Sequence, residues 1–402
     1  MVSITLIPGI GSRQCLPWQR ILTGSGLSFI IGICSNCNFN SIVMRYLFIV
    51  QGEGRGHLTQ AMTLESLLLE RGHQVVKVLV GKSPQRKLPA FFESGITAPV
   101  KTFESMNFMP SADNKRPDMF KTVVFNGFEL YRFFPSMQLI RDEIRTSGAD
   151  VVVNFYELMA GMTYFFHHID VPMVCIGHQY LFLHKDFGLP KGKYPGSMAL
   201  DLFSRLTSVG AVKHLALSFR KMDPDVRHGI VVVPPLLRRE VLQTVAEPGE
   251  YIHGYMLNAG FSKEVIEWHE MHPEVELRFF WDKWDEGQVK RIDDKMTLYL
   301  IDDREFLCQM KGCRAYASTA GFESICEAMY LGKPVLMVPS HIEQEINAFD
   351  AVRSGAGIAC DRFDLDRLLE FSRSFVPDDE FADWVRSAPS RIIAELENVS
   401  QI

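Results

Sequence analysis

From Met44 onward, short apolar runs alternate with longer stretches of helical periodicity. This alternation is typical of a mostly parallel sheet covered by helices, because parallel strands need a crossover between them. A first series of predicted strands lies at 45–50, 74–80, 98–103, 150–154, 172–177 and 230–233. A second series lies at 251–257, 275–281, 296–300, 314–318, 335–338 and 357–360. We therefore expect an α/β protein of two doubly wound, Rossmann-like domains that face a central cleft.

The gaps in this pattern set the expected domain boundaries. The run Val231-Val-Val-Pro-Pro235 closes the first series. We expect an N-terminal domain at 44–235, a linker at 236–249, a C-terminal domain at 250–376 and a last helical segment at 377–402. Residues 1–43 differ from the rest, since Arg13 and Arg20 are their only charged residues. We predict that they are a non-native or disordered extension and that Met44 is the natural start.

Composition narrows the class of protein. The chain has 402 residues, of which 47% are hydrophobic and 22% charged, as in a typical soluble globular protein. Its net charge of −6 argues against a general nucleic-acid binder. Cys34 and Cys37 form a C-x-x-C without a second pair, so no zinc site is expected. No apolar run reaches the ~18 residues of a membrane-spanning helix, and we expect a cytoplasmic protein.

One segment adds local charge to this picture. Residues 181–228 carry eight Lys or Arg against four Asp or Glu, in a chain that is acidic overall. A solvated protein face is the simpler interpretation. Peripheral docking at an anionic membrane surface, through the N-terminal domain at the inner face of the membrane, is the alternative.

The segment 318–347 carries the strongest candidate chemistry. A predicted strand breaks at Thr319-Ala-Gly321 and is followed by a helix that Gly332 and Pro334 end. Small residues at such a turn leave backbone N–H groups free to bind a phosphate. Further along, Glu327 can accept hydrogen bonds from a ribose, and Glu343-Gln344 can bind sugar hydroxyls. An ordinary βαβ unit with a tight turn is the alternative.

A glycine-rich loop follows the first predicted strand. Gly52, Gly54 and Gly56 alternate there, and His57 occupies the third glycine position of the G-x-G-x-x-G dinucleotide fingerprint. The loop also lacks the GK[ST] of a P-loop. What remains is a flexible loop that lets the backbone approach a ligand. A histidine at the start of a helix tends to be neutral and able to accept a proton, although a lone loop histidine is more often structural.

The segment 318–347 resembles the nucleotide-sugar box of the UDP-glycosyltransferases and of the N-acetylglucosaminyltransferase that completes lipid II. The resemblance implies the GT-B fold, with a nucleotide diphosphate sugar, such as a UDP-sugar, on the C-terminal domain. It assigns the diphosphate to Gly321 and Ser324, the ribose to Glu327, and the donor sugar to Glu343 and Gln344. Thr319 stands where many relatives have a histidine, and Glu323 stands where a neutral residue is common.

Further donor contacts follow from the same resemblance. Tyr299 or the backbone of Ile301 would serve the base, where plant relatives stack a tryptophan. The backbone at Asn258 and Gly260 would help to hold the diphosphate. Members of this fold class generally use helix dipoles in place of a metal. Since the D-x-D triplets lie far from these motifs, we expect no metal and no cofactor beyond the nucleotide-sugar co-substrate.

The catalytic roles are also implied by the resemblance. His57 matches the histidine that deprotonates the acceptor hydroxyl in plant UDP-glycosyltransferases. Those enzymes orient it with an aspartate, for which Asn154 is the nearest equivalent and Glu157 a reserve. His178 closes a strand at the cleft edge, where it could touch the acceptor. The N-terminal domain would bind that acceptor, and the aromatic residues of 155–206 leave a lipid open beside simple core packing.

We therefore predict an inverting hexosyltransferase that joins a nucleotide-sugar donor to a hydroxyl acceptor such as a lipid or glycan precursor. The last helix would cross back to the N-terminal domain, as is common in this fold. A UDP-sugar 2-epimerase of the same fold and a non-catalytic nucleotide-sugar sensor are the alternatives. The failed fingerprint at His57 counts against an NAD-dependent oxidoreductase.

Overall fold

The structure is a computed structural model that describes residues 20–23, 26–29, 43–105, 130–190, 194–256 and 259–401. The chain forms two compact units, Met1–Ile42 and Val43–Ile402. The described residues of the first unit are an antiparallel strand pair, β1 (Arg20–Thr23) and β2 (Gly26–Phe29). Most of 1–43 lies outside the described residues, so its interpretation as an extension stays a prediction.

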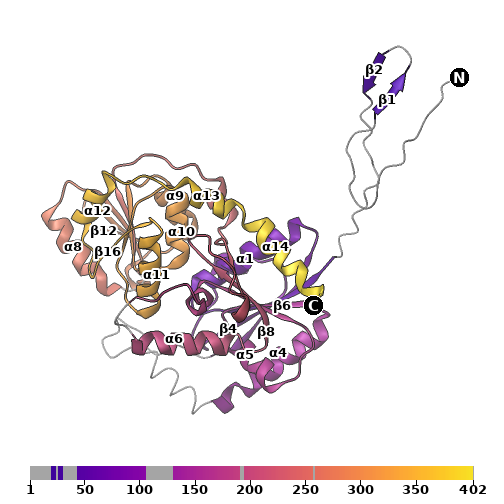
Figure 1. Cartoon of the computed structure of the whole chain (residues 1–402). Coiled ribbons are helices and arrows are strands. Elements are labelled where there is room, and N and C mark those ends of the chain that lie inside the picture. The colour runs from indigo at the N-terminus through magenta and orange to yellow at the C-terminus, as the bar shows by residue number, and fades with distance from the viewer. Residues whose placement is uncertain are drawn as a thin grey trace. The chain divides into compact units, whose positions relative to one another are not determined.

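Seven parallel strands form the first sheet of the second unit, in the order β5-β4-β3-β6-β7-β8-β9 (Figure 1). The strands are β3 (Arg45–Gln51), β4 (Gln74–Lys82), β5 (Val100–Glu104), β6 (Val151–Phe155), β7 (Met173–Gly177), β8 (Ala211–Leu217) and β9 (Ile230–Val233). The chain reverses its direction of travel across the sheet between β3 and β6. Ligands of doubly wound sheets bind at the carboxyl ends of the strands at such a switch point.

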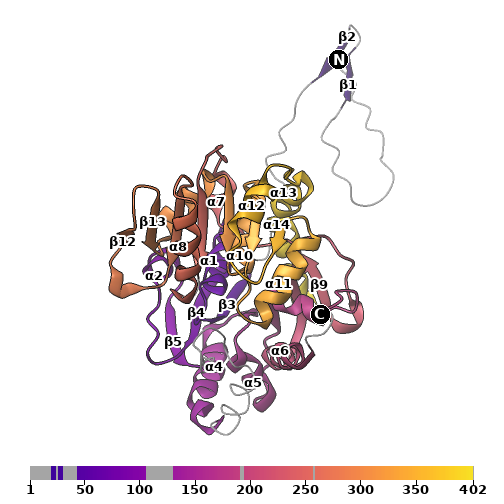
Figure 2. The same ribbon diagram turned by 90° about the vertical axis from the view of Figure 1, so that its left-hand side faces the viewer.

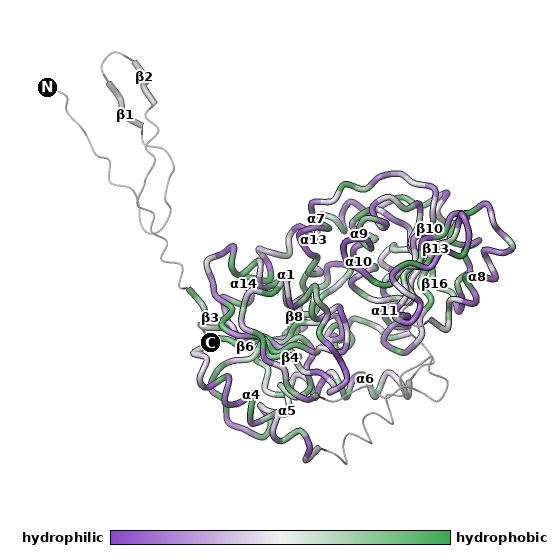
Figure 3. Tube along the Cα trace, turned by 180° about the vertical axis from the view of Figure 1, so that it is seen from behind, coloured by the Kyte–Doolittle hydropathy of each residue, from purple (hydrophilic) through white to green (hydrophobic). Residues whose placement is uncertain are grey.

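Helices cover both faces of this sheet because each presents an apolar stripe to it. In α1 (Arg55–Glu70) the buried residues include Leu58, Ala61, Leu64 and Leu68, at helical spacings of three and four. The remaining elements are α2 (Ala90–Gly95), η1 (Leu130–Phe133), α4 (Phe134–Ser147), α5 (Leu158–Phe166), η2 (His178–Leu183), α6 (Tyr194–Thr207) and η3 (Val226–His228). The strands themselves run as hydrophobic segments through the interior (Figure 3).

The second sheet also has seven strands, in the order β12-β13-β11-β10-β14-β15-β16. The strands are β10 (Ile252–Met256), β11 (Leu277–Trp281), β12 (Val289–Arg291), β13 (Met296–Leu300), β14 (Ala315–Ser318), β15 (Val335–Met337) and β16 (Gly357–Ala359). All neighbours are parallel except β12, which pairs antiparallel at one edge. Its helices are η4 (Ala259–Phe261), α8 (Ser262–Met271), η5 (Trp284–Glu286), α9 (Asp303–Lys311), α10 (Phe322–Tyr330), α11 (Ile342–Arg353) and α12 (Leu365–Ser372). The predicted pair of doubly wound sheets is confirmed.

Two segments connect the sheets. The first holds α7 (Arg239–Gln243) and leads from β9 to β10. The second holds α13 (Asp379–Arg386) and α14 (Ala388–Glu397), which are followed by η6 (Asn398–Gln401). α13 packs on α10 of the second sheet, whereas α14 packs on α1 and β9 of the first. Trp384 donates its indole N–H to the Ser218 carbonyl at 3.0 Å, and Lys213 pairs with Glu395 at 2.7 Å. One hydrophobic core therefore runs from the first sheet into α10, α13 and α14.

The carboxyl ends of the two sheets meet around two helix N-termini. α1 follows β3 of the first sheet, and α10 follows β14 of the second. Both helices are labelled in Figures 1 and 2, and a hydrogen bond between Gln60 and Glu323 joins them near their N-terminal ends.

Candidate active site

The glycine loop brings α1 close to the rest of the protein. The Gly52 amide donates to the Gly81 carbonyl at 2.7 Å, and a Cβ on Gly52 would lie 2.7 Å from that oxygen. A side chain there would therefore collide with the backbone of β4. The position of a Cβ on Gly56 is filled by the Glu323 carboxylate of α10. Gly54 precedes α1 as its N-cap. Gly56, in the first turn of α1, thus leaves room for the Glu323 side chain of α10.

His57 lies in the first turn of α1, with its ring half-buried and stacked on Tyr156 at a centroid distance of 5.6 Å. Its Nδ1 is 3.4 Å from Gln60 Oε1, and its Nε2 is 3.5 Å from Gln179 Nε2. An amide nitrogen can only donate, whereas an amide oxygen can only accept. The proton therefore belongs on Nδ1 and the lone pair on Nε2. Burial lowers the pKa of His57 to about 4, so the ring is neutral at pH 7.

The predicted partner of His57, Asn154, is engaged elsewhere. Its Nδ2 donates to the carbonyls of Thr207 at 2.8 Å and Glu157 at 3.2 Å, and its Oδ1 accepts the Glu157 N–H at 2.8 Å. The amide thereby uses its hydrogens on the backbone that follows β6 and on the last residue of α6. The prediction that Asn154 orients His57 is wrong, because Gln60 and Gln179 hold the ring instead.

Glu157, the reserve partner, caps α5 and does not hold His57 either. Its Oε1 accepts from Met159 N at 3.0 Å and from Ser105 Oγ at 2.5 Å, and its Oε2 lies against Gly81. The cause is Tyr156, whose left-handed φ of 59° turns the chain sharply after β6. That turn stacks Tyr156 on His57 and directs Glu157 toward β4 and β5. Burial raises the pKa of Glu157 to about 7.

The turn before α10 has the shape expected of an anion site. β14 ends at Ser318, Ala320 has a left-handed φ of 61°, and Gly321 is the N-cap of α10. A non-glycine residue in this region costs about 1 kcal/mol or more, so the packing around the turn must hold it there. The first-turn amides of α10 are left without intrahelical partners. Ser324 donates its hydroxyl to the Gly321 carbonyl at 3.2 Å.

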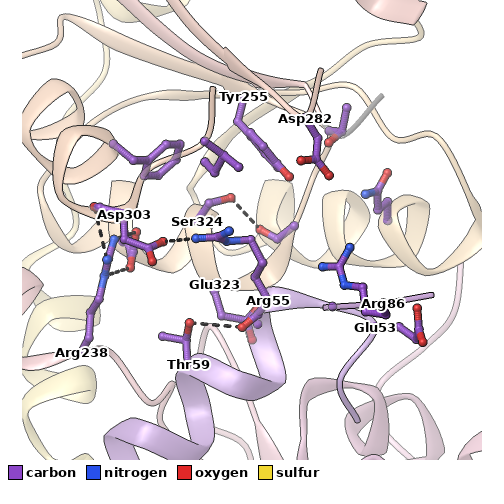
Figure 4. Close-up of a pocket in the computed structure, with 18 residues that line it drawn as sticks. Glu53, Arg55, Thr59, Arg86, Arg238, Tyr255, Asp282, Asp303, Glu323 and Ser324 are labelled. Carbon is purple, nitrogen blue, oxygen red and sulfur yellow. Dashed lines mark hydrogen bonds and ion pairs between the residues drawn. The ribbon is translucent and has the colours of Figure 1, made fainter. Parts of the chain in front are cut away.

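A first cavity of about 250 Å³ opens at this turn (Figure 4). The structure gathers six predicted donor residues in its lining: Ile301, Thr319, Gly321, Ser324, Glu327 and Gln344. Glu327 is buried, and its carboxylate accepts from Arg238 Nε at 2.8 Å and Nη2 at 3.3 Å. Burial raises the pKa of Glu327, and the charge of Arg238 opposes this rise. Glu327, the residue predicted to bind the ribose, thus forms an ion pair with Arg238 in the segment that joins the sheets.

A second cavity of about 310 Å³ lies beside His57. The two cavities share Gly56, Gly321, Glu323 and Gln344 among their lining residues, so they adjoin one another. Glu343 reaches the second cavity and accepts from Gln179 Nε2 at 2.8 Å. The donor site and the candidate base therefore face one continuous space between the sheets.

Four predicted residues, including Gln344 of the first cavity, need separate description. Gln344 Oε1 accepts from the backbone N–H of Ser340 at 2.9 Å and thereby ties down the loop before α11. His178 lines the second cavity, but its ring is fixed: Nδ1 is 2.7 Å from the Leu217 carbonyl oxygen, and the ring stacks on Phe322 at 4.0 Å. Gly260 is exposed in η4, and neither of the two cavities counts it among its lining residues. Asn258 lies outside the described residues.

Comparison with known proteins places this geometry in a family. The model of glycosyl transferase family 1 matches residues 44–376. The chain belongs to this family. No curated protein sequence matches this glycosyltransferase.

Solved structures share its GT-B fold, which confirms the predicted fold class. One is LpCGTa in complex with UDP, with 16% identity and a TM-score of 0.60, covering 90% of this chain and 100% of that one. Another is Medicago truncatula UGT71G1 complexed with UDP-glucose, with 15% identity, a TM-score of 0.59 and coverage of 88% and 98%. A third is Arabidopsis thaliana UGT89C1 complexed with UDP-L-rhamnose, with 14% identity, a TM-score of 0.59 and coverage of 89% and 99%. The predicted resemblance to UDP-glycosyltransferases is confirmed, and the comparison with the lipid II enzyme stays a prediction.

Sequence reasoning missed several polar residues of this glycosyltransferase. Arg55, Arg86 and Arg238 line the first cavity, and Arg55 reaches across it to Asp303 of α9 at 2.7 Å (Figure 4). Gln60 and Gln179 hold His57. Their positions depend on how the two sheets face each other.

Within the described residues of the glycosyltransferase, no cluster of three or more His, Cys, Asp or Glu side chains is placed to bind a metal ion. None of the helices in the described part of the chain combines the length and apolar character that a bilayer crossing requires.

Proposed function

We propose that this glycosyltransferase is an inverting enzyme that transfers a hexose from a UDP-sugar to a hydroxyl acceptor. The observation that carries the proposal is the neutral His57, which lines the cavity beside the N-terminus of α10 and holds its Nε2 lone pair toward Gln179, another residue of that lining. A base and an anion site that share one space suit a reaction between a hydroxyl group and a sugar diphosphate. The neighbours crystallised with UDP, UDP-glucose and UDP-L-rhamnose support the choice of donor.

The donor would occupy the first cavity. The free amides of α10 at Gly321 and Ser324 would bind the diphosphate. Arg86 faces the same cavity, and its Nε has no hydrogen-bond partner among the described residues. It would add a positive charge where negative charge develops on the leaving group. Glu327 would bind the ribose, while Glu343 and Gln344 border the second cavity and would contact the sugar.

The acceptor hydroxyl would enter the second cavity and replace the Gln179 amide at His57 Nε2. His57 would accept its proton while the hydroxyl oxygen attacks the anomeric carbon. The bond from that carbon to the diphosphate oxygen would break on the opposite face, which inverts the configuration. Because the reactants are held between two sheets, their alignment is fixed before reaction and water is excluded. Tyr156, Leu200, Phe322 and Ile342 give this cavity apolar walls, which favour an acceptor with an apolar body.

A two-stage experiment tests the proposal. Thermal unfolding is first measured with UDP, GDP, dTDP, CMP and NAD; a nucleotide at 100 times its Kd should stabilise by about 2.7 kcal/mol. We expect UDP to stabilise the wild type and to lose this effect in Glu327→Ala. Each UDP-sugar is then incubated with and without hydroxyl acceptors, including a lipid, and the products are analysed by mass spectrometry and NMR.

The outcomes separate the candidate functions. A new β-linked glycoside from an α-linked UDP-sugar, lost in His57→Ala, supports an inverting transferase. Isomerisation of the UDP-sugar without any acceptor would mean a 2-epimerase. Binding of UDP without turnover would indicate a sensor, and stabilisation by NAD alone would overturn the donor assignment.

A further inference from the structure

A chain of polar contacts runs from Glu323 to His57 and crosses between the sheets. Gln60 Nε2 donates to Glu323 Oε1, and Gln60 Oε1 is 3.4 Å from His57 Nδ1. His57 and Gln60 belong to α1 of the first sheet, whereas Glu323 belongs to α10 of the second. The carboxylate in this chain therefore comes from the opposite half of the molecule, 263 residues away in the sequence.

The position of the Gln60 amide decides which nitrogen of His57 carries the proton. Gln60 is 1% exposed, so water offers little competition for its hydrogen bonds. Burial raises the pKa of Glu323 to about 7, so its carboxylate is ionised above that pH. While Glu323 is ionised, a flipped amide would place its oxygen against the carboxylate and leave two acceptors in contact. Glu323 therefore holds the amide with its oxygen toward Nδ1. The proton is kept on Nδ1, and Nε2 keeps a lone pair for the proton of a hydroxyl that replaces the Gln179 amide.

The surroundings of Glu323 fit this arrangement. Its carboxylate occupies the space that a side chain at position 56 would need, so Gly56 lets α10 come this close to α1. Glu323 also begins the first turn of α10, beside the proposed diphosphate site. A carboxylate there would repel a phosphate unless it turned away. The bond to Gln60 gives Glu323 a partner on α1 and explains an acidic residue at this position.

We propose that Glu323 is a positioning residue that acts on His57 through Gln60. The inference rests on the proposed function, in which His57 is the base. In the plant UDP-glycosyltransferases that the sequence resembles, an aspartate later in the same domain orients the histidine. Here the orienting carboxylate reaches His57 from the other sheet. The orientation of the base therefore depends on the contact between Gln60 of α1 and Glu323 of α10.

The experiment compares Glu323→Ala with Glu323→Gln in the full chain. A glutamine at 323 can present its carbonyl oxygen to Gln60 Nε2 and so retain the contact without the charge. An alanine removes the acceptor and frees the Gln60 amide to flip. The first readout is the tautomer of His57 in the enzyme without substrates, from ¹⁵N NMR of histidine-labelled protein, with the resonances assigned by comparison with His57→Asn.

We expect the wild type and Glu323→Gln to hold the Nδ1–H tautomer, and Glu323→Ala to show a substantial fraction of Nε2–H. The second readout is transfer. Glu323→Ala should lower kcat by about tenfold to 10²-fold, part of the 10²–10⁴-fold that general base catalysis supplies, with a smaller change in the donor KM. Glu323→Gln should stay within about threefold of the wild type. Thermal unfolding shows that each variant is folded.

The results separate this inference from the proposed function. An unchanged tautomer in folded Glu323→Ala would overturn the inference even if the wild type transfers sugar. Equal damage in Glu323→Gln and Glu323→Ala would also overturn it, because the charge rather than the hydrogen bond would then matter. If the tautomer shifts as expected but no protein transfers sugar, the positioning contact stands and the proposed function fails.

Discussion

The ion pair between Arg238 and Glu327 makes a quantitative prediction about stability. Arg238→Met removes the guanidinium but keeps much of the side-chain length. The side chains are 19% and 7% exposed, so this pair is largely buried. Removing one partner of a buried pair costs about 3–5 kcal/mol, since the other charge is left uncompensated. Because Arg238 keeps some contact with water, we expect a loss of about 3 kcal/mol in the free energy of unfolding at pH 8.

The pH dependence of this loss has a definite sign. Burial already raises the pKa of Glu327, and removing Arg238 takes away the charge that opposes this rise. A carboxyl group whose pKa is raised by folding contributes stability at low pH and loses it as the pH rises through the folded-state pKa. The cost of Arg238→Met should therefore be smaller at pH 5 than at pH 8, because a lower pH favours the uncharged form of Glu327 in the variant. Adding Glu327→Gln to Arg238→Met should recover much of the loss at pH 8.

Urea unfolding followed by circular dichroism at pH 5 and pH 8 measures these differences. The neighbouring Arg239 supplies the control, because its contact with Glu70 is long, at 3.7 Å, and the two side chains are 70% and 57% exposed. Arg239→Met should change stability by less than about 0.5 kcal/mol. The reasoning is refuted if both variants cost the same, or if the cost of Arg238→Met is equal at the two pH values.

Three further predictions concern histidine and asparagine side chains. His57→Ala should lower kcat by about 10²–10⁴-fold with little change in the donor KM. Because burial lowers the pKa of His57 to about 4, the kcat/KM of the wild type should fall only as the pH approaches 4. A fall in kcat/KM centred at pH 6.5 would contradict this. Asn154→Ala should lower the free energy of unfolding by about 1–3 kcal/mol, since it leaves buried backbone groups unpaired. The kcat of the folded variant should stay within about threefold of the wild type. A 10²-fold loss of kcat at full stability would restore the catalytic role of Asn154. Burial lowers the pKa of His178 to about 4, below the unfolded value near 6.5. The stability that the neutral ring contributes is therefore present above pH 6.5 and lost as the pH falls toward 4. His178→Phe should make the free energy of unfolding, measured in urea, depend less on pH between 6.5 and 4, and an unchanged dependence would contradict this.

The sequence predicted the fold because most strands carry a strong local pattern. Besides β1 and β2 of the first unit, the missed strands are two that lack this pattern. β8 (Ala211–Leu217) includes Lys213 and His214 and is only partly buried, while β12 (Val289–Arg291) is a three-residue edge strand. The residues of the first cavity were also accessible from sequence, since Gly321, Ser324 and Glu327 lie within one strand–turn–helix unit.

The surroundings of His57 could not be predicted in the same way. Gln60 is only three residues away, but its role depends on Glu323, which belongs to the other sheet. The prediction for Asn154 was wrong because Tyr156, with its left-handed φ, turns the chain after β6. An aromatic residue gives no sequence signal for that conformation. Contacts between the sheets depend on how whole elements pack. A single sequence does not encode them locally.

The return of α14 to the first sheet has a consequence for synthesis of the chain. The strands of the first sheet are complete once Val233 has been made, and domains generally begin to fold as they leave the ribosome. Yet α1 and β9 gain their last covering element only when Ala388–Glu397 emerges. About 150 residues must be translated in between, which at 5–20 residues per second takes roughly 8–30 seconds. During that interval the nascent first sheet keeps an apolar face open, which chaperones can bind and which a stalled or truncated chain would never cover.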